Sequence, residues 1–184
     1  MTLEPFLDAS LWIRLHALCA APAVLLGPVA LYRRGRDAIH RWVGRIWVAS
    51  MAALAASGLL IPSHDFALVG PFGPIHVLSL VTLASLALGV ADARAGRFAA
   101  HGARMRAVFF GALGLAGLFT LVPGRTLNRM AFPDAPEAGW AAIGLIGTAL
   151  ALLWWRDRRV AVSAVPERAV VTRKKPLHIF RPSR

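Results

Sequence analysis

Long apolar stretches alternate with short polar ones along the chain. Each apolar stretch has close to the roughly 20 residues that an α-helix needs to cross a bilayer at about 1.5 Å of rise per residue. Backbone groups without hydrogen bonds are very costly in hydrocarbon, so these stretches must be helices rather than strands of an open sheet. The pattern therefore predicts an all-α, polytopic membrane protein with five spans, at residues 10–32, 43–61, 75–91, 99–122 and 138–155.

The polar connections differ in charge, and the difference predicts an orientation. All of the 21 lysines and arginines lie in or beside the first and third connections or after residue 155, except Arg14, Arg125 and Arg129. Short segments rich in Lys and Arg stay in the cytoplasm. We therefore expect the N-terminus outside, the C-terminus inside, a transmembrane domain over residues 1–155 and a basic cytoplasmic tail over 156–184.

The tryptophans give a second test of these spans, because this residue is enriched at both headgroup boundaries of a membrane. Trp12 and Trp140 are expected at the outer boundary. The other four are expected at the inner boundary: Trp42, Trp47, Trp154 and Trp155.

Composition agrees with a membrane protein and removes other classes. Hydrophobic residues make up 57% of the chain and charged residues only 16%, unlike a soluble domain. The net charge of +12 does not indicate a nucleic-acid partner, because the basic residues follow the apolar runs instead of covering one face. The single cysteine, Cys19, is expected to be a small core residue. No basic residue precedes the first run, unlike in a cleaved signal peptide, so that run is expected to remain in the mature protein.

Spans one and two match spans three and four at a shift of about 60 residues, which indicates an internal repeat. Both units, residues 10–62 and 70–123, start outside, so a pseudo-two-fold axis along the membrane normal should relate them. We predict a four-helix bundle built from these two helix pairs, with a fifth transmembrane helix at 138–155. The matching positions are His16 with His76, Gly27 with Gly89, Arg36 with Arg97, His40 with His101, and Arg45 with Arg106.

The repeat places the histidines in two pairs. In an up-down four-helix bundle, the first and third helices are diagonal, as are the second and fourth. His16 would then face His76 near the outer surface, and His40 would face His101 near the inner one. Imidazole nitrogen is a usual axial ligand of haem iron, so we expect these four residues to ligate one or two b-type haems. A histidine at a membrane boundary is more often only hydrogen-bonded, and that is the expectation for His64 and His178, which have no repeat partner.

Arginines near the pairs are candidates for binding haem propionates, because a guanidinium binds a planar carboxylate through two hydrogen bonds. Each could instead serve only to set the topology or to contact lipid. Arg14 lies on roughly the opposite helix face from His16 and is expected to reach the outer headgroups. The candidates are Arg36, Arg45, Arg97 and Arg106 at the inner pair, and Arg125 at the outer pair.

Spans one to four resemble a family of bacterial predicted membrane proteins defined by domain of unknown function 2306. The resemblance rests on the histidine of the first span, the His40-Arg41-x-x-Gly44-Arg45 element, His76, the His101-x-x-x-Met105 element and Arg125. The paired-histidine plan is also similar in kind to cytochrome b561-like and ferric-reductase-like membrane cytochromes. That likeness implies two b haems that move electrons across the membrane.

Three functional hypotheses follow. The first is electron transfer through b-type haem in the bacterial inner membrane, with a quinol or a soluble donor as redox partner. The second is a non-redox accessory or assembly subunit of a larger membrane complex, held by its helix faces. The third is a transporter, but Asp37, Asp65 and Asp92 all lie at span ends or in loops, whereas proton-coupled transport usually needs an acid near the midplane.

Overall fold

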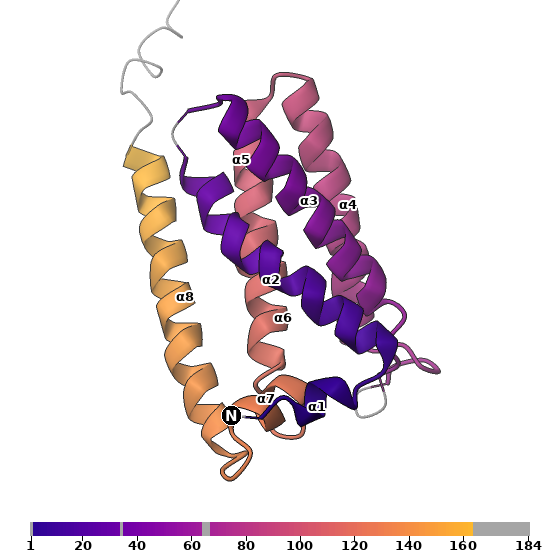
Figure 1. Cartoon of the computed structure of the whole chain (residues 1–184). Helices are drawn as coiled ribbons and strands as arrows, with labels where there is room; N and C mark the ends of the chain where they lie inside the picture. The colour runs from indigo at the N-terminus through magenta and orange to yellow at the C-terminus, as the bar shows by residue number, and fades with distance from the viewer. Residues whose placement is uncertain (1, 34, 64–66, 164–184) are drawn as a thin grey trace, which may run out of the picture.

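The computed structural model describes residues 2–33, 35–63 and 67–163 (Figure 1). These residues are almost entirely helical, and Val69 and Phe72 form an isolated β-bridge in a connection. The elements are α1 (Glu4–Leu7), α2 (Leu11–Tyr32), α3 (Ala38–Gly58), α4 (Pro74–Arg94), α5 (Phe98–Ala107), the π-helix η1 (Val108–Leu113), α6 (Gly114–Phe119), α7 (Thr126–Ala131) and α8 (Ala138–Ser163).

Within the described residues, four helical segments are long and apolar enough to cross a membrane, which confirms a helical, polytopic membrane fold. They are Leu11–Tyr32, Pro74–Arg94, Phe98–Phe119 and Ala138–Arg159, and each overlaps a span predicted from the apolar pattern. The second predicted span coincides with α3, which has 21 residues but is not one of these four segments. This helix carries Arg41 and Arg45 in its first half.

The bundle is closed and consists of α2, α3, α4 and α5. Contacts join α2 to α3, α3 to α4, α4 to α5 and α5 back to α2. In a bundle with these neighbours, α2 lies diagonal to α4, and α3 lies diagonal to α5. The α8 helix runs along the edge of this bundle, where it contacts α6 (Figure 1).

A compact apolar core fills the bundle. Trp47 is only 1% exposed, and its indole N–H donates to the Ala23 carbonyl at 2.9 Å. The prediction of a boundary position for Trp47 is therefore wrong, because the indole turns inward, beside Gly27, whose missing side chain leaves room for it. The core cluster consists of Ala23, Trp47, Met51, Leu54, Leu86, Met105, Val108 and Leu113.

The end of the bundle near α1 carries a small cap that the apolar pattern did not predict. The short helices α1 and α7 contact each other there, and the Thr2 N–H donates to the Met130 carbonyl (Figure 1). Asn128 is completely buried, and its side-chain amide donates to the carbonyls of Leu121 and Pro136, each at 2.9 Å. This asparagine therefore fixes the turn between α6 and α8.

The α8 helix continues beyond the predicted end of the fifth span, to Ser163. An ion pair between Arg106 and Asp157, 2.9 Å long, links it to α5. Residues 164–184 of the predicted basic tail, including His178, lie outside the described residues, as does His64 in the second connection.

Candidate functional site

The two histidines expected near the inner surface, His40 and His101, lie in the first turns of α3 and α5. The backbone N–H of His40 donates to the side chain of Asp37, the N-cap residue of α3. Nδ1 of His101 lies 2.8 Å from the Gly89 carbonyl of α4. Because a carbonyl only accepts, this nitrogen must carry the proton, and the neutral ring then has its lone pair on Nε2. Ligating histidines commonly have this arrangement, with the other nitrogen bonded to an acceptor that orients the ring.

His40 differs from His101 in its surroundings. Its Nδ1 is buried and has no hydrogen-bond partner among the described residues. Buried polar atoms in folded proteins are nearly always paired, so an unpaired ring nitrogen marks a position where a ligand, an ion or a water molecule is expected.

A cation–π contact brings the starts of α3 and α5 together. The guanidinium carbon of Arg36, just before α3, lies 4.0 Å from the centre of the Phe98 ring, in the first residue of α5. His40 lies four residues after Arg36, and His101 lies three residues after Phe98. Going deeper from this end, Trp47 lies about 10 Å beyond His40 and Met105 about 6 Å beyond His101, at 1.5 Å per residue. The two histidines therefore lie at the end of the bundle, beyond the apolar core.

The two histidines expected near the outer surface, His16 and His76, have different hydrogen-bond partners. Nδ1 of His16 lies 3.2 Å from Oγ of Ser57 in α3. The Ser57 hydroxyl donates its proton to the Leu54 carbonyl, so it accepts from Nδ1 of His16. Nε2 of His16 therefore keeps its lone pair. Gly58 lies beside this ring, and a Cβ atom there would be 3.2 Å from Cε1 of His16 and 3.1 Å from Oγ of Ser79.

His76 has the opposite proton arrangement. Its Nδ1 accepts from the backbone N–H of Gly73 at 3.0 Å, so the neutral ring carries its proton on Nε2. The side chain is 4% exposed and packs edge-on against Phe72. In this position His76 caps the start of α4 and offers no lone pair at Nε2 for a metal.

The five candidate arginines contact groups of the protein itself. Arg97 donates two hydrogen bonds to Asp92, and Arg106 pairs with Asp157. The other three stack on rings: Arg36 on Phe98, Arg45 over Trp42 at 5.4 Å, and Arg125 over Phe119 at 4.5 Å. The charges of Arg97 and Arg106 are therefore already neutralised by carboxylates. A contact with the face of a ring leaves the N–H groups of Arg36 and Arg45 available as donors.

Sequence reasoning missed the buried carboxylate of Asp92, which it placed at a span end. Its side chain is 8% exposed and binds both Arg97 and Arg104, so it joins the last turn of α4 to α5. The signal in the sequence was an acid inside a connection that is otherwise basic.

Long apolar helices joined by short connections define a helical, multi-span membrane protein. The chain belongs to the family described as predicted membrane protein DUF2306, whose model matches residues 13–155. This range contains the four histidines matched by the sequence repeat and the five candidate arginines. No curated protein and no solved structure matches the chain.

Proposed function

We propose that the chain is an inner-membrane protein with five spans, its N-terminus outside and its C-terminus inside, that binds b-type haem and transfers electrons. The inner pair, His40 and His101, is the primary site. The observation that carries the proposal is the free Nε2 lone pair of His101, next to a helix start that also holds the unpaired Nδ1 of His40.

The chemistry of the inner pair supports this proposal, because His101 keeps a lone pair on Nε2 and Nδ1 of His40 has no partner among the described residues. His40 on α3 and His101 on α5 would hold the haem iron through their ring nitrogens. The Gly89 carbonyl holds the Nδ1 proton of His101, which orients the ring and makes Nε2 a better donor. Bound haem would supply a one-electron couple. The proposal counts α3 as a span in addition to the four long apolar segments. The arginines near the start of α3 suit a position beside the headgroups.

The outer pair, His16 and His76, is a secondary site. His16 offers a lone pair at Nε2, but His76 would first have to release the Gly73 N–H. That exchange would leave a buried backbone donor unpaired, at a cost of about 1–3 kcal/mol. We therefore expect the inner centre to fill before the outer one.

Absorption spectra of the detergent-purified protein, oxidised and then reduced with dithionite, test this function. We expect sharp reduced-state bands of a six-coordinate b-type haem. His40→Ala and His101→Ala should each abolish the inner centre, and the double variant should lose little more, because both residues hold one group. His16→Ala and His76→Ala are the matched controls, and both should retain the inner centre.

Two outcomes would overturn the proposal. If folded protein from haem-sufficient cells has no such bands, the alternative of an accessory or assembly subunit takes its place. If His16→Ala removes the same centre as His40→Ala, the diagonal pairing is wrong.

If haem is bound, the electron donor can be identified by testing whether a quinol or a soluble protein reduces it.

Reporter fusions test the orientation. We expect fusions after Asp65 and Phe132 to report an external position, and fusions after Arg36, Arg97 and Arg168 a cytoplasmic one, because the basic connections should stay inside. A cytoplasmic signal after Asp65 would show that α3 does not cross the membrane.

A further inference from the structure

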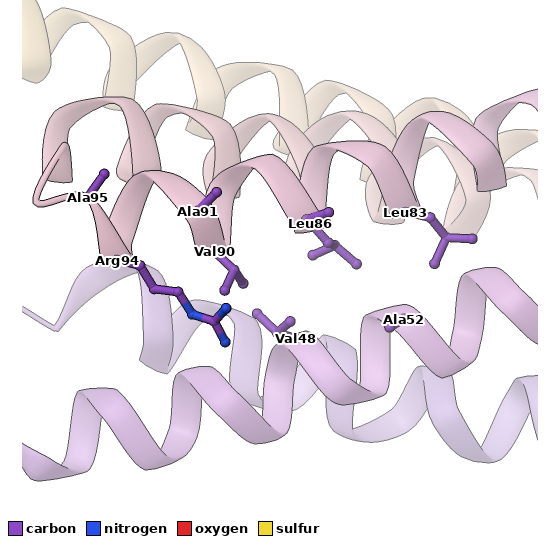
Figure 2. A pocket seen from close by; sticks show the side chains of 9 residues that line it. Val48, Ala52, Leu83, Leu86, Val90, Ala91, Arg94 and Ala95 are labelled. Atoms are coloured by element: carbon purple, nitrogen blue, oxygen red, sulfur yellow. The ribbon is translucent and has the colours of Figure 1, made fainter.

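An open groove of about 730 Å³ runs along the flank of the bundle between α3 and α4 (Figure 2). Its lining includes Val48 and Ala52 of α3 and Leu83, Val90 and Ala91 of α4. Alanine side chains keep the groove hollow, and Ala91 is exposed. An apolar groove open on the flank of a membrane-spanning bundle faces the acyl chains of the bilayer.

Among the described residues that line the groove, Arg94 is the one with a charged side chain. It is the last residue of α4, and Figure 2 shows its side chain reaching toward α3 beside Val48. Within the described residues, Arg94 has no hydrogen bond, ion pair or ring contact. The nearest acid along α4, Asp92, already binds Arg97 and Arg104. Arg94 is exposed, so its guanidinium is available to an anionic group outside the described residues.

The dimensions of the groove match one leaflet of a bilayer. From Leu83 to Arg94, α4 rises roughly 16 Å at about 1.5 Å per residue, or about half of the 30 Å hydrocarbon thickness. Arg94 ends an apolar span, so it lies at headgroup depth whichever way the protein is oriented. A molecule with an apolar chain of this length and an anionic end fits both features.

We propose that this groove binds an anionic phospholipid. One acyl chain lies against Val48, Ala52 and Ala91, and the phosphate accepts hydrogen bonds from Arg94. This site is separate from the histidine pairs, so the proposal does not depend on haem.

Native mass spectrometry of the full-length, detergent-purified protein tests the proposal. The probes are dioleoyl-phosphatidylglycerol, which is anionic, and dioleoyl-phosphatidylcholine, which has the same chains and no net charge. We expect about fivefold tighter retention of the anionic lipid, the effect of one arginine near a charged headgroup. Arg94→Gln should remove this preference. Arg158→Gln is the matched control, since Arg158 is exposed on α8 over Trp154, and it should keep the preference.

A second pair of variants tests the groove itself. Ala91→Leu fills the groove with Arg94 intact, and it should reduce retention of both lipids. Ala84→Leu makes the same change at an exposed position of α4 outside the lining, and it should have no effect. Circular dichroism checks that both variants keep their helices.

Three results would overturn the proposal. The first is equal retention of the two lipids by the unmodified protein. The second is a preference for phosphatidylglycerol that persists in Arg94→Gln. The third is a dimer that Ala91→Leu dissociates, which would make a second copy of the chain the occupant.

Discussion

The first helix pair, α2–α3, and the second, α4 with α5, η1 and α6, have matching histidines but hold them differently. In the first pair, His16 donates to Ser57 of the neighbouring helix, and Nδ1 of His40 is unpaired. In the second, His76 caps its own helix, and His101 donates to Gly89 of the neighbouring helix. A repeat in sequence thus predicts the level of a histidine in the bundle, but not which ring nitrogen carries its proton.

The helix starts explain one of these differences. The N-cap residue of α2 is Ser10, whose hydroxyl accepts from the Ile13 N–H and so satisfies the first turn. His16 is therefore free to reach α3. The N-cap residue of α4 is Gly73, which has no side chain to cap the turn, and His76 pairs with its N–H instead.

The largest expected difference between the two pairs concerns their matching glycines. A Cβ atom at Gly27 would collide with the ring of Phe109 and lie 3.0 Å from Nε1 of Trp47, two rigid groups. At Gly89 it would collide with the flexible end of Met105. We expect Gly27→Ala to lower the free energy of unfolding by about 1–3 kcal/mol. Gly89→Ala should cost less, because Met105 can change its rotamer and alanine favours the helix by up to about 1 kcal/mol.

Unfolding of both glycine variants in the same detergent, followed by circular dichroism, measures this difference. A larger loss for Gly89→Ala would mean that the second pair is packed more rigidly than its contacts indicate.

A smaller difference is expected between the two outer histidines. His76→Ala leaves the Gly73 N–H buried without a partner, so it should cost about 1–3 kcal/mol. His16→Ala removes a hydrogen bond from a half-buried ring whose partner, Ser57, still donates to Leu54, so it should cost about 0.5–1.5 kcal/mol. Thermal unfolding of the two variants without added haem gives the comparison. Equal losses would argue against the capping role of His76.

The apolar pattern predicted the ends of α2 and α4 closely, but not the start of α3, the end of α8 or which side of a helix is buried. The ends of α2 and α4 lie within three residues of the predicted runs, and the family resemblance is confirmed over residues 13–155. Trp47 was misplaced because, in a membrane, the inward and outward faces of a helix are both apolar, so periodicity does not reveal which face is buried.

The candidate site was predictable only in part, for a related reason. The proton position in His76 depends on a single backbone N–H that lies 3.0 Å away. The burial of Asn128 depends on the path of the chain between α6 and α8. The spacing of residues predicts neither the proton position of His76 nor the burial of Asn128, because both depend on how a connection folds onto a helix end.

The smallest expected effects come from two carboxylates, that of Asp37 at the start of α3 and that of Asp92 in the last turn of α4. Asp37, in the first pair, is exposed and binds Arg33, whereas Asp92, in the second, is buried and binds two arginines on α5 or at its start. We expect Asp92→Asn to lower the thermal midpoint more than Asp37→Asn, because it releases two guanidinium groups and a link between helices. Thermal unfolding at neutral pH measures both, and a larger effect at Asp37 would contradict this order.

Titration distinguishes what Asp37 itself contributes. The hydrogen bond from Arg33, and then the His40 backbone N–H, hold the pKa of the Asp37 carboxyl well below its ordinary value. A carboxyl with a lowered pKa stabilises the folded state above the ordinary value of about 4, and this contribution is lost as the pH falls toward the lower folded value. The midpoint of the unmodified protein should therefore exceed that of Asp37→Asn slightly at pH 7, and the gap should narrow below pH 4. The gap should also shrink in high salt, because the Arg33 pair is exposed. A difference in thermal midpoint that stays constant between pH 7 and pH 3 would contradict this account. It would show that the charge of Asp37 does not contribute, and that the two proteins differ only in the strength of the N-cap hydrogen bond, which asparagine also makes.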